Sequence, residues 1–248
     1  MIYSSELDIP QLKNDHISAR DFFKDYGFHI ERNHFEKKFC TNIINHFCSS
    51  TNYKSQNYKP EMMSHNKINF PNNLMKNKEL VNFVNLYIGD NINEIFGLQS
   101  TFFYGPPGTQ GFPMHQDSFY NEPSDSWGFC SAWIPLVDIE EDMGNLIVYK
   151  NSHLKGKLPV RKLNLAKDPN QDPNFNNEEA IIESNKYDKI YIKEKMGSIV
   201  FLHGDLVHSS IKNKTNKYRF VQLISYIRGN CTFRAGHTAK RKFIDLKQ

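Results

Sequence analysis

The chain has 248 residues, of which 39% are hydrophobic, and its formal net charge is +4. A β-rich chain of this length commonly forms one domain, so we expect a single domain over residues 1–248. The lysines are scattered and no apolar run approaches the roughly 18 residues of a membrane span, which argues against nucleic acid and membrane as partners and leaves small molecules.

The beginning of the sequence, MIYSSELDIP, lacks the basic start and the apolar run of a secretory signal, so we expect a cytoplasmic protein. The four cysteines, Cys40, Cys48, Cys130 and Cys231, form no closely spaced pair, and we expect them to be reduced thiols. Nothing in the composition decides between a monomer and a homodimer.

The first part of the chain, about residues 1–97, is predicted to be helical. One apolar stripe recurs every fourth residue at Phe35, Phe39, Ile43 and Phe47. A second stripe follows at Leu80, Phe83, Val84, Tyr87 and Ile88, before Gly89 and Asp90 interrupt it. We expect both helices to pack on a sheet through these stripes.

From Leu98 onward the pattern changes to short runs of β-branched and aromatic residues bounded by turns. These runs predict strands at 98–104, 129–137, 145–149, 189–193, 198–202 and 219–227. No long helical pattern interrupts them, so we expect a β-sandwich or barrel core over about residues 98–230. A polar segment at about 161–183, rich in Pro, Asn and Asp, is interpreted as an insertion at the rim of this core.

The pair His115 and Asp117 is a candidate metal site. Side chains at positions i and i+2 of an extended strand lie on the same face, so both can bind one ion. His208, from a distant strand, would supply a second imidazole. Two imidazoles and one carboxylate on one side of an octahedral ion form the facial triad that Fe(II) favours, and they leave three positions open.

His203 competes with His208 for the second imidazole position. In an uninterrupted strand the two side chains would point to opposite faces, so only one of them should reach the metal. We assign His208, because its spacing to Arg219 matches the family motif described below.

Arg219 is predicted to point inward from the last strand, in a row with Val221, Leu223 and Ser225. A buried guanidinium needs an anion, which is either an acidic side chain of the protein or the far carboxylate of a bound dicarboxylate. Ser210, two residues beyond His208, can donate a hydrogen bond to the same carboxylate.

These residues lie in a wider pattern: His115-Gln116-Asp117, Ala132-Trp133 followed by Asp138, Gly144-Asn145-Leu146, Ser152-His153, and His208-x-Ser210 with Asn213 and Arg219. This pattern closely resembles the phytanoyl-CoA dioxygenase family of 2-oxoglutarate-dependent oxygenases. The resemblance covers nearly the whole chain, because residues 21–40 are similar to the opening helix and first strand of the family.

The resemblance implies a mainly β fold with flanking helices, a double-stranded β-helix of the jelly-roll, cupin-like kind. It also implies an enzyme that uses Fe(II), O2 and 2-oxoglutarate, releases succinate and CO2, and hydroxylates a small organic metabolite. Arg219 and Ser210 would bind 2-oxoglutarate, Trp133 would lie near it or belong to the core, and Gln99 is a further candidate for this contact.

The loop after Asp117 contains three aromatic residues among turn formers, Phe119, Tyr120 and Trp127. Aromatic side chains beside an open metal position suit a lid over the substrate, although ordinary packing explains them equally well. The lid could also be the polar insertion at 161–183.

Other functions remain open on the same residues. A cupin-like binding protein without catalytic activity would keep the fold but would not need Arg219 or a complete triad. A halogenase would replace Asp117 with a small residue, and a zinc hydrolase would need no dicarboxylate anchor. Desaturation and ring closure use the same site as hydroxylation, and the substrate itself is not identified by the sequence.

Overall fold

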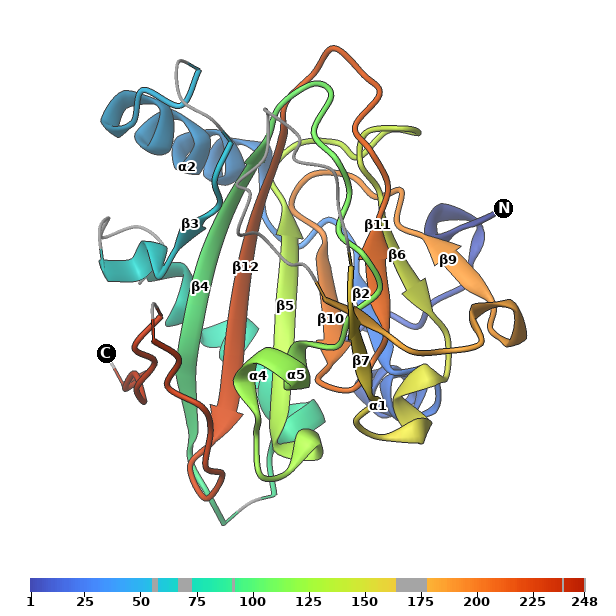
Figure 1. Cartoon of the computed structure of the whole chain (residues 1–248). Helices are drawn as coiled ribbons and strands as arrows, with labels where there is room; N and C mark the ends of the chain where they lie inside the picture. The colour runs from blue at the N-terminus through green and yellow to red at the C-terminus, as the bar shows by residue number, and fades with distance from the viewer. Residues whose placement is uncertain (55–57, 67–72, 91, 164–177, 238, 248) are drawn as a thin grey trace.

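The computed structural model describes the chain except for residues 55–57, 67–72, 91, 164–177, 238 and 248. Two β-sheets face each other, and helices cover the outer side of the larger sheet (Figure 1). Among the helices that are described, none has the length and apolar character needed to cross a lipid bilayer.

The described α-helices are α1 (His16–Tyr26), α2 (Lys37–Ser50), α4 (Lys78–Ile88) and the short α5 (Asp117–Asn121). Single 3₁₀ turns lie at Ser4–Glu6, Ser64–Asn66, Ser126–Gly128, Ser152–Lys155 and Ser184–Lys186. The starts of α1 and α4 have a local cause, because the side chains of Asp15 and Asn77 accept hydrogen bonds from backbone N–H groups of the first turn.

The larger sheet contains, in spatial order, β2 (Phe28–Glu31), β10 (Ile199–His203), β5 (Phe129–Pro135), β12 (Arg219–Arg228), β4 (Ile95–Gly105) and β3 (Glu61–Met62). The smaller sheet contains β1 (Ile2–Tyr3), β9 (Lys189–Tyr191), β6 (Leu146–Tyr149) and β11 (His208–Ser210). A separate hairpin pairs β7 (Val160–Lys162) with β8 (Glu178–Ala180).

Strand β12 lies between β4 and β5 and is antiparallel to both. Its side chains alternate between two cores, as predicted. Phe220 and Ile224 belong to the core between the larger sheet and the helices, whereas Val221 belongs to the core between the sheets. Arg219 and Leu223 line a cavity on the same inner side as Val221.

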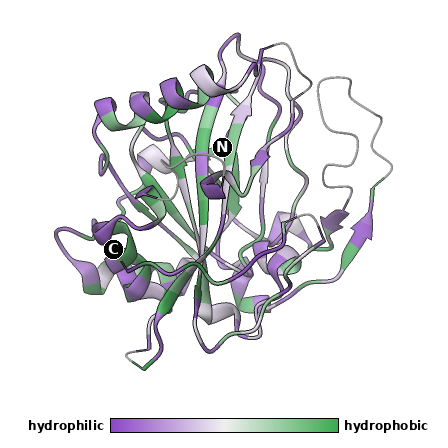
Figure 2. Ribbon diagram, turned by 90° about the vertical axis from the view of Figure 1, so that its left-hand side faces the viewer, coloured by the Kyte–Doolittle hydropathy of each residue, from purple (hydrophilic) through white to green (hydrophobic). Residues whose placement is uncertain are grey.

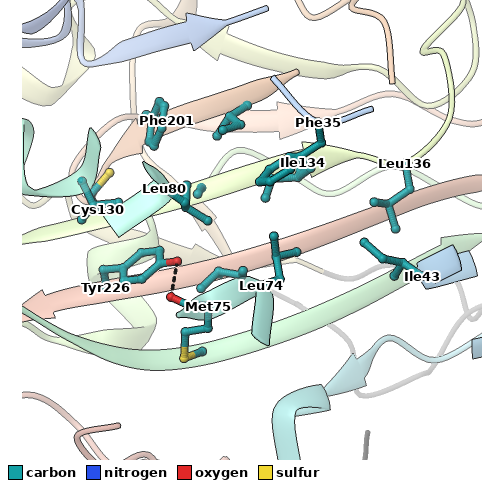
Figure 3. Packing of buried hydrophobic residues seen from close by; sticks show 14 of the residues in the cluster. Phe35, Ile43, Leu74, Met75, Leu80, Cys130, Ile134, Leu136, Phe201 and Tyr226 are labelled. Atoms are coloured by element: carbon teal, nitrogen blue, oxygen red, sulfur yellow. Dashed lines mark hydrogen bonds between the residues drawn. The ribbon is translucent and has the colours of Figure 1, made fainter. Parts of the chain in front are cut away.

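The predicted helix stripes are confirmed, because Ile43 of α2 and Leu80 and Val84 of α4 are buried in the core against the larger sheet. Figure 3 shows this packing, with Tyr226 of β12 donating a hydrogen bond of 3.0 Å to the backbone oxygen of Met75. The second core joins the two sheets, and the long central strands are mostly green, that is hydrophobic, in Figure 2.

The predicted strands are present, but one expectation needs correction and one is not tested. Residues 1–97, expected to be mainly helical, also supply β1 and β3, which are too short for a clear alternating pattern, whereas β2 lies in the segment where the family resemblance implied a first strand. Most of the predicted insertion at 161–183 lies outside the described residues, and its two flanks form the β7–β8 hairpin. The four cysteines are unpaired, as predicted.

We predict that Tyr226→Phe lowers the free energy of unfolding by about 1–2 kcal/mol, because the buried carbonyl of Met75 loses its donor. Urea denaturation measures this change. Tyr187→Phe is the control, since the Tyr187 hydroxyl makes no hydrogen bond to a described residue, and its stability should stay near that of the parent. Equal stabilities of the two variants would contradict the prediction.

Candidate metal centre

His115 and His208 are joined by their backbones. The N–H of His115 donates to the oxygen of His208, and the N–H of His208 donates to the oxygen of His115, both at 2.9 Å. This antiparallel bridge attaches the loop after β4 to β11. It also brings the two imidazole rings to a centroid separation of 4.1 Å.

Asp117 completes the cluster, but it is not in a strand. Gln116 is extended, with φ −119° and ψ 137°, so His115 and Asp117 still point the same way as the spacing predicted. Asp117 is the first residue of α5, and the N–H of Ser118 donates to the backbone oxygen of Gly204 at 2.9 Å. One ligand atom each from His115, Asp117 and His208 lie within 4.8 Å of one another.

Both imidazoles have their Nε2 atoms available. Nδ1 of His115 donates to the backbone oxygen of Pro113 at 2.8 Å, and Nδ1 of His208 donates to that of Leu206 at 3.0 Å. A carbonyl oxygen only accepts, so the proton is on Nδ1 and the Nε2 lone pair is free in each neutral ring. Burial, with help from His208, lowers the pKa of His115, which keeps this ring neutral near pH 7.

Within the described part of the chain, the carboxylate of Asp117 is held on one side. The hydroxyl of Ser131 in β5 donates to Oδ2 at 2.6 Å. The hydroxyl oxygen of Ser225 in β12 lies 3.2 Å from the hydroxyl oxygen of Ser131. Oδ1 lies 3.7 Å from Nε2 of His208. One carboxylate oxygen is therefore fixed by the sheet, and the other is turned toward the imidazoles.

Gln116 has a structural role that was not predicted. Its amide donates to the backbone oxygens of Gly156 at 2.8 Å and Asp205 at 2.6 Å, and its oxygen accepts from the N–H of Leu158 at 2.8 Å. The residue between the two ligand candidates thus anchors them to two neighbouring loops. Alternation in an extended segment, which puts Gln116 on the face opposite to His115 and Asp117, was the only signal in the sequence.

A cavity between the two sheets contains this cluster. It is lined by Phe103, Phe112, His115, Asp117, Trp133, Leu146, Leu202, His208, Ser209, Ser210, Arg219 and Leu223. Its walls are mostly apolar, and charged residues occur at the His-Asp-His cluster and at Arg219. Trp133 is therefore both a wall of the cavity and part of the core between the sheets.

Arg219 is 7% exposed, and Nη1 donates to the backbone oxygen of Gly144. Its Nε is buried and makes no hydrogen bond with the described residues, and no carboxylate among them forms an ion pair with it. Burial lowers its pKa. The alternative of an internal salt bridge is thus not supported by the described part of the chain.

Ser210 also lines the cavity that contains Arg219. Its hydroxyl oxygen accepts from the N–H of Phe112 at 2.8 Å, which leaves the hydroxyl proton to be donated elsewhere. This arrangement is compatible with the donor role that the sequence suggested.

Three other candidates lie elsewhere. Gln99 does not line the cavity, and its side-chain oxygen accepts from Arg241 at 2.6 Å. Trp127 packs its ring against His203 at a centroid distance of 4.3 Å instead of facing the cavity. His203 is on β10 and outside the metal-binding cluster, because the chain turns between it and His208.

The other two aromatic candidates, Phe119 and Tyr120, are on α5. Tyr120 places its ring 5.9 Å from that of His115, and Phe119 packs against Tyr120 at 5.1 Å. Both residues are partly exposed. They lie beside the metal-binding cluster, as the spacing predicted, but on a short helix and not on a loop.

We predict that Ser131→Ala weakens the affinity for Fe(II) by about 10- to 100-fold, because Asp117 loses the hydrogen bond that orients it. Anaerobic titration of Fe(II) by calorimetry measures the change. Ser100→Ala is the control, because it also removes a buried serine hydroxyl but one that contacts Ser64 and His65 instead. If both variants bind Fe(II) like the parent, Ser131 does not orient the carboxylate.

Several solved structures share this fold. A nogalamycin-biosynthesis protein titled non-heme alpha-ketoglutarate-dependent carbocyclase SnoK is 15% identical, with a TM-score of 0.71 over 94% of this chain and 91% of its own. The protein titled non-heme monooxygenase ThoJ is 18% identical, with a TM-score of 0.70 over 91% of this chain and 83% of its own. These likenesses confirm the predicted double-stranded β-helix.

A curated relative is the peroxisomal phytanoyl-CoA dioxygenase of Bos taurus, which is 26% identical over 165 residues. The match covers 62% of this chain and 45% of the bovine protein, so the chain aligns with less than half of that relative. The model of the phytanoyl-CoA dioxygenase (PhyH) family matches residues 10–221. This match extends over most of the chain and includes the His-Asp-His cluster and Arg219, and the chain therefore belongs to the phytanoyl-CoA dioxygenase family.

Proposed function

We propose that this protein is an Fe(II)- and 2-oxoglutarate-dependent dioxygenase with His115, Asp117 and His208 as metal ligands. The observation that carries the proposal is one cavity with a His-Asp-His cluster and, apart from it, a buried arginine whose Nε has no partner among the described residues. A bound metal ion explains why the two imidazoles and the carboxylate converge, and a bound dicarboxylate explains why a buried arginine has an Nε left unpartnered by the described part of the chain.

The ligand atoms suit Fe(II). Two imidazole Nε2 atoms and the Oδ1 atom of Asp117 converge, while the other polar atoms of these side chains are already bonded to the protein. This donor set leaves positions open on a six-coordinate ion. Bound iron would supply the sites at which a 2-oxo acid and O2 bind and react.

The protein orients the cosubstrate. Arg219 binds the far carboxylate of 2-oxoglutarate with Nε and Nη2, while Nη1 stays on Gly144. Ser210 donates its hydroxyl proton to the same carboxylate. Trp133 and Leu146 form apolar walls that exclude water from the cosubstrate. The main contribution of the protein is position and shielding, so no separate general base is required.

Hydroxylation of a small organic metabolite is the reaction that we propose. Solved structures that share this fold include proteins described as a carbocyclase, an epimerase and a monooxygenase, so other oxidations are compatible with this fold. Ring closure or desaturation would use the same cavity and ligands. Mass spectrometry of the product separates the outcomes, since hydroxylation adds an oxygen atom and desaturation or ring closure removes two hydrogen atoms.

The first functional prediction concerns the ligands. His115→Ala, Asp117→Ala and His208→Ala should each abolish Fe(II)-dependent formation of succinate from 2-oxoglutarate, because each removes one of three ligands. His203→Gln should retain a substantial part of the activity, since this buried histidine lies outside the cluster. Loss of activity in His203→Gln with activity kept in His208→Ala would refute the assignment.

The second functional prediction concerns the anchor. Arg219→Ala should weaken 2-oxoglutarate binding by about 10- to 100-fold through loss of charge-assisted hydrogen bonds. Arg219→Lys keeps the charge without the planar fork, so its affinity for 2-oxoglutarate should lie between those of the parent and of Arg219→Ala. Anaerobic titration of the Fe(II)-loaded protein measures the affinities, with the exposed Lys217→Ala as the control for a lost surface charge. Normal affinity in Arg219→Ala would mean that the anchor lies elsewhere.

A further inference from the structure

The segment after β12 returns to the candidate site. The side chain of Arg234 donates to the backbone oxygens of Tyr120 at 3.2 Å and Phe119 at 3.3 Å, and its N–H donates to that of Asn121 at 2.7 Å. Farther on, Ile244 forms a backbone bridge with Gly97 of β4. In Figure 1 the red C-terminal trace accordingly runs alongside β4. The segment after β12 therefore contacts both α5, which begins with Asp117, and β4.

Arg241 is the residue of this segment that points to the sheet. Its Nε donates to the side-chain oxygen of Gln99 at 2.6 Å, and its Nη1 donates to the backbone oxygen of Arg234 at 3.1 Å. Its Nη2 makes no hydrogen bond with a described residue, and none of the described carboxylates forms an ion pair with the guanidinium. The group is half-buried, and its charge has no carboxylate of the described residues at ion-pair distance.

A row of side chains connects Arg241 to the metal-binding cluster. Gln99 lies opposite Ser225 in the sheet, and Ser225 lies opposite Ser131, which donates to the carboxylate of Asp117. The charge of Asp117 acts on Arg241, since it partly offsets the lowering of the Arg241 pKa by burial and by Arg234. Arg241 is thus near the metal side of the cavity.

The two arginines lie at different positions along β12, and that of Arg241 is level with the cluster. Arg219 is at the start of β12 opposite Gly105, whereas Gln99, the partner of Arg241, is opposite Ser225 farther along the same strand and on the same face. At a rise of about 3.4 Å per residue, these two positions are about 20 Å apart along β12. If 2-oxoglutarate occupies the side of Arg219, the side of Arg241 is left for the second substrate.

The polarity of the sheet changes between these two sides. Near Arg219 the walls are apolar, for example Phe103, which lies opposite Val221. Near Arg241 the inward side chains are polar and buried, and the amide of Gln99 donates to the hydroxyl of Thr101 at 3.2 Å. A buried polar surface beside a cation without an ion-pair partner among the described residues suits a ligand that is polar and negatively charged.

We propose that Arg241 recognises an anionic group, a carboxylate or a phosphate ester, on the substrate that is oxidised. This inference rests on the proposed function, because the position left for that substrate is defined by 2-oxoglutarate bound at Arg219. Nη2, with the outer edge of the guanidinium, donates to the anion. Gln99 and the backbone oxygen of Arg234 hold the fork in place for this contact.

The test compares three probes of equal chain length, hexanoate, hexyl phosphate and 1-hexanol. Each is titrated by calorimetry into the full chain loaded with Fe(II) and saturating 2-oxoglutarate without O2. The parent protein should bind at least one anion about tenfold or more tightly than the alcohol, as expected for a charge-assisted hydrogen bond. The preferred anion identifies the group as a carboxylate or a phosphate ester.

Arg241→Gln should remove the preference for the anion and leave the affinity for 2-oxoglutarate unchanged. Arg241→Lys should restore part of the preference, which a purely structural role of the side chain would not produce. Lys242→Gln is the matched control, because it removes an exposed charge of the same sign from the same segment. Its preference should equal that of the parent.

Two results would overturn the inference: equal binding of the alcohol and both anions by the parent protein, or an anion preference that survives in Arg241→Gln. Failure of the proposed function is recognised separately. In that case the parent protein itself binds no 2-oxoglutarate in the presence of Fe(II), whatever residue is present at position 241.

Discussion

Two backbone hydrogen bonds between His115 and His208 determine the geometry on which the candidate site depends. They join a loop that follows the larger sheet to a short strand of the smaller sheet, and they set the separation of the two imidazoles. Side-chain bonds alone would allow each ring to turn. With the backbones paired and both Nδ1 atoms bonded to carbonyl oxygens, little freedom is left, and the Nε2 atoms face the same point before any metal binds.

The inner face of the larger sheet has an apolar part and a polar part near the metal-binding cluster. One end of β12 presents Arg219 between apolar walls, which suits a small dicarboxylate shielded from water. Farther along the strand, Ser225 and Ser131 form a polar path to Asp117. Because side chains alternate along β12, Arg219 and Ser225 are on the same face of this strand. One binds the cosubstrate that we propose, and the other supports the serine that orients a metal ligand.

Local pattern was sufficient for much of this architecture. The helix stripes and the β-branched runs predicted elements correctly because burial acts on neighbouring residues with a fixed period. The three residues of the metal-binding cluster followed from an i, i+2 pair and from family resemblance. What the sequence did not reveal depends on contacts between distant segments: Gln99 binds Arg241, which is 142 residues away, and Trp127 packs against His203. No local periodicity encodes such pairs.

The position of β12 has a consequence for how the chain folds. This strand lies between β4 and β5, although it comes after both of them in the chain. Until β12 is in place, β4 and β5 each have an open edge that can pair with another chain, and the sheet depends on contacts of long sequence separation. Such topologies form slowly and expose apolar surface on the way. During synthesis, the strands on either side of β12 therefore stay unpaired at that edge until β12 is made. Aggregation competes with folding during this time.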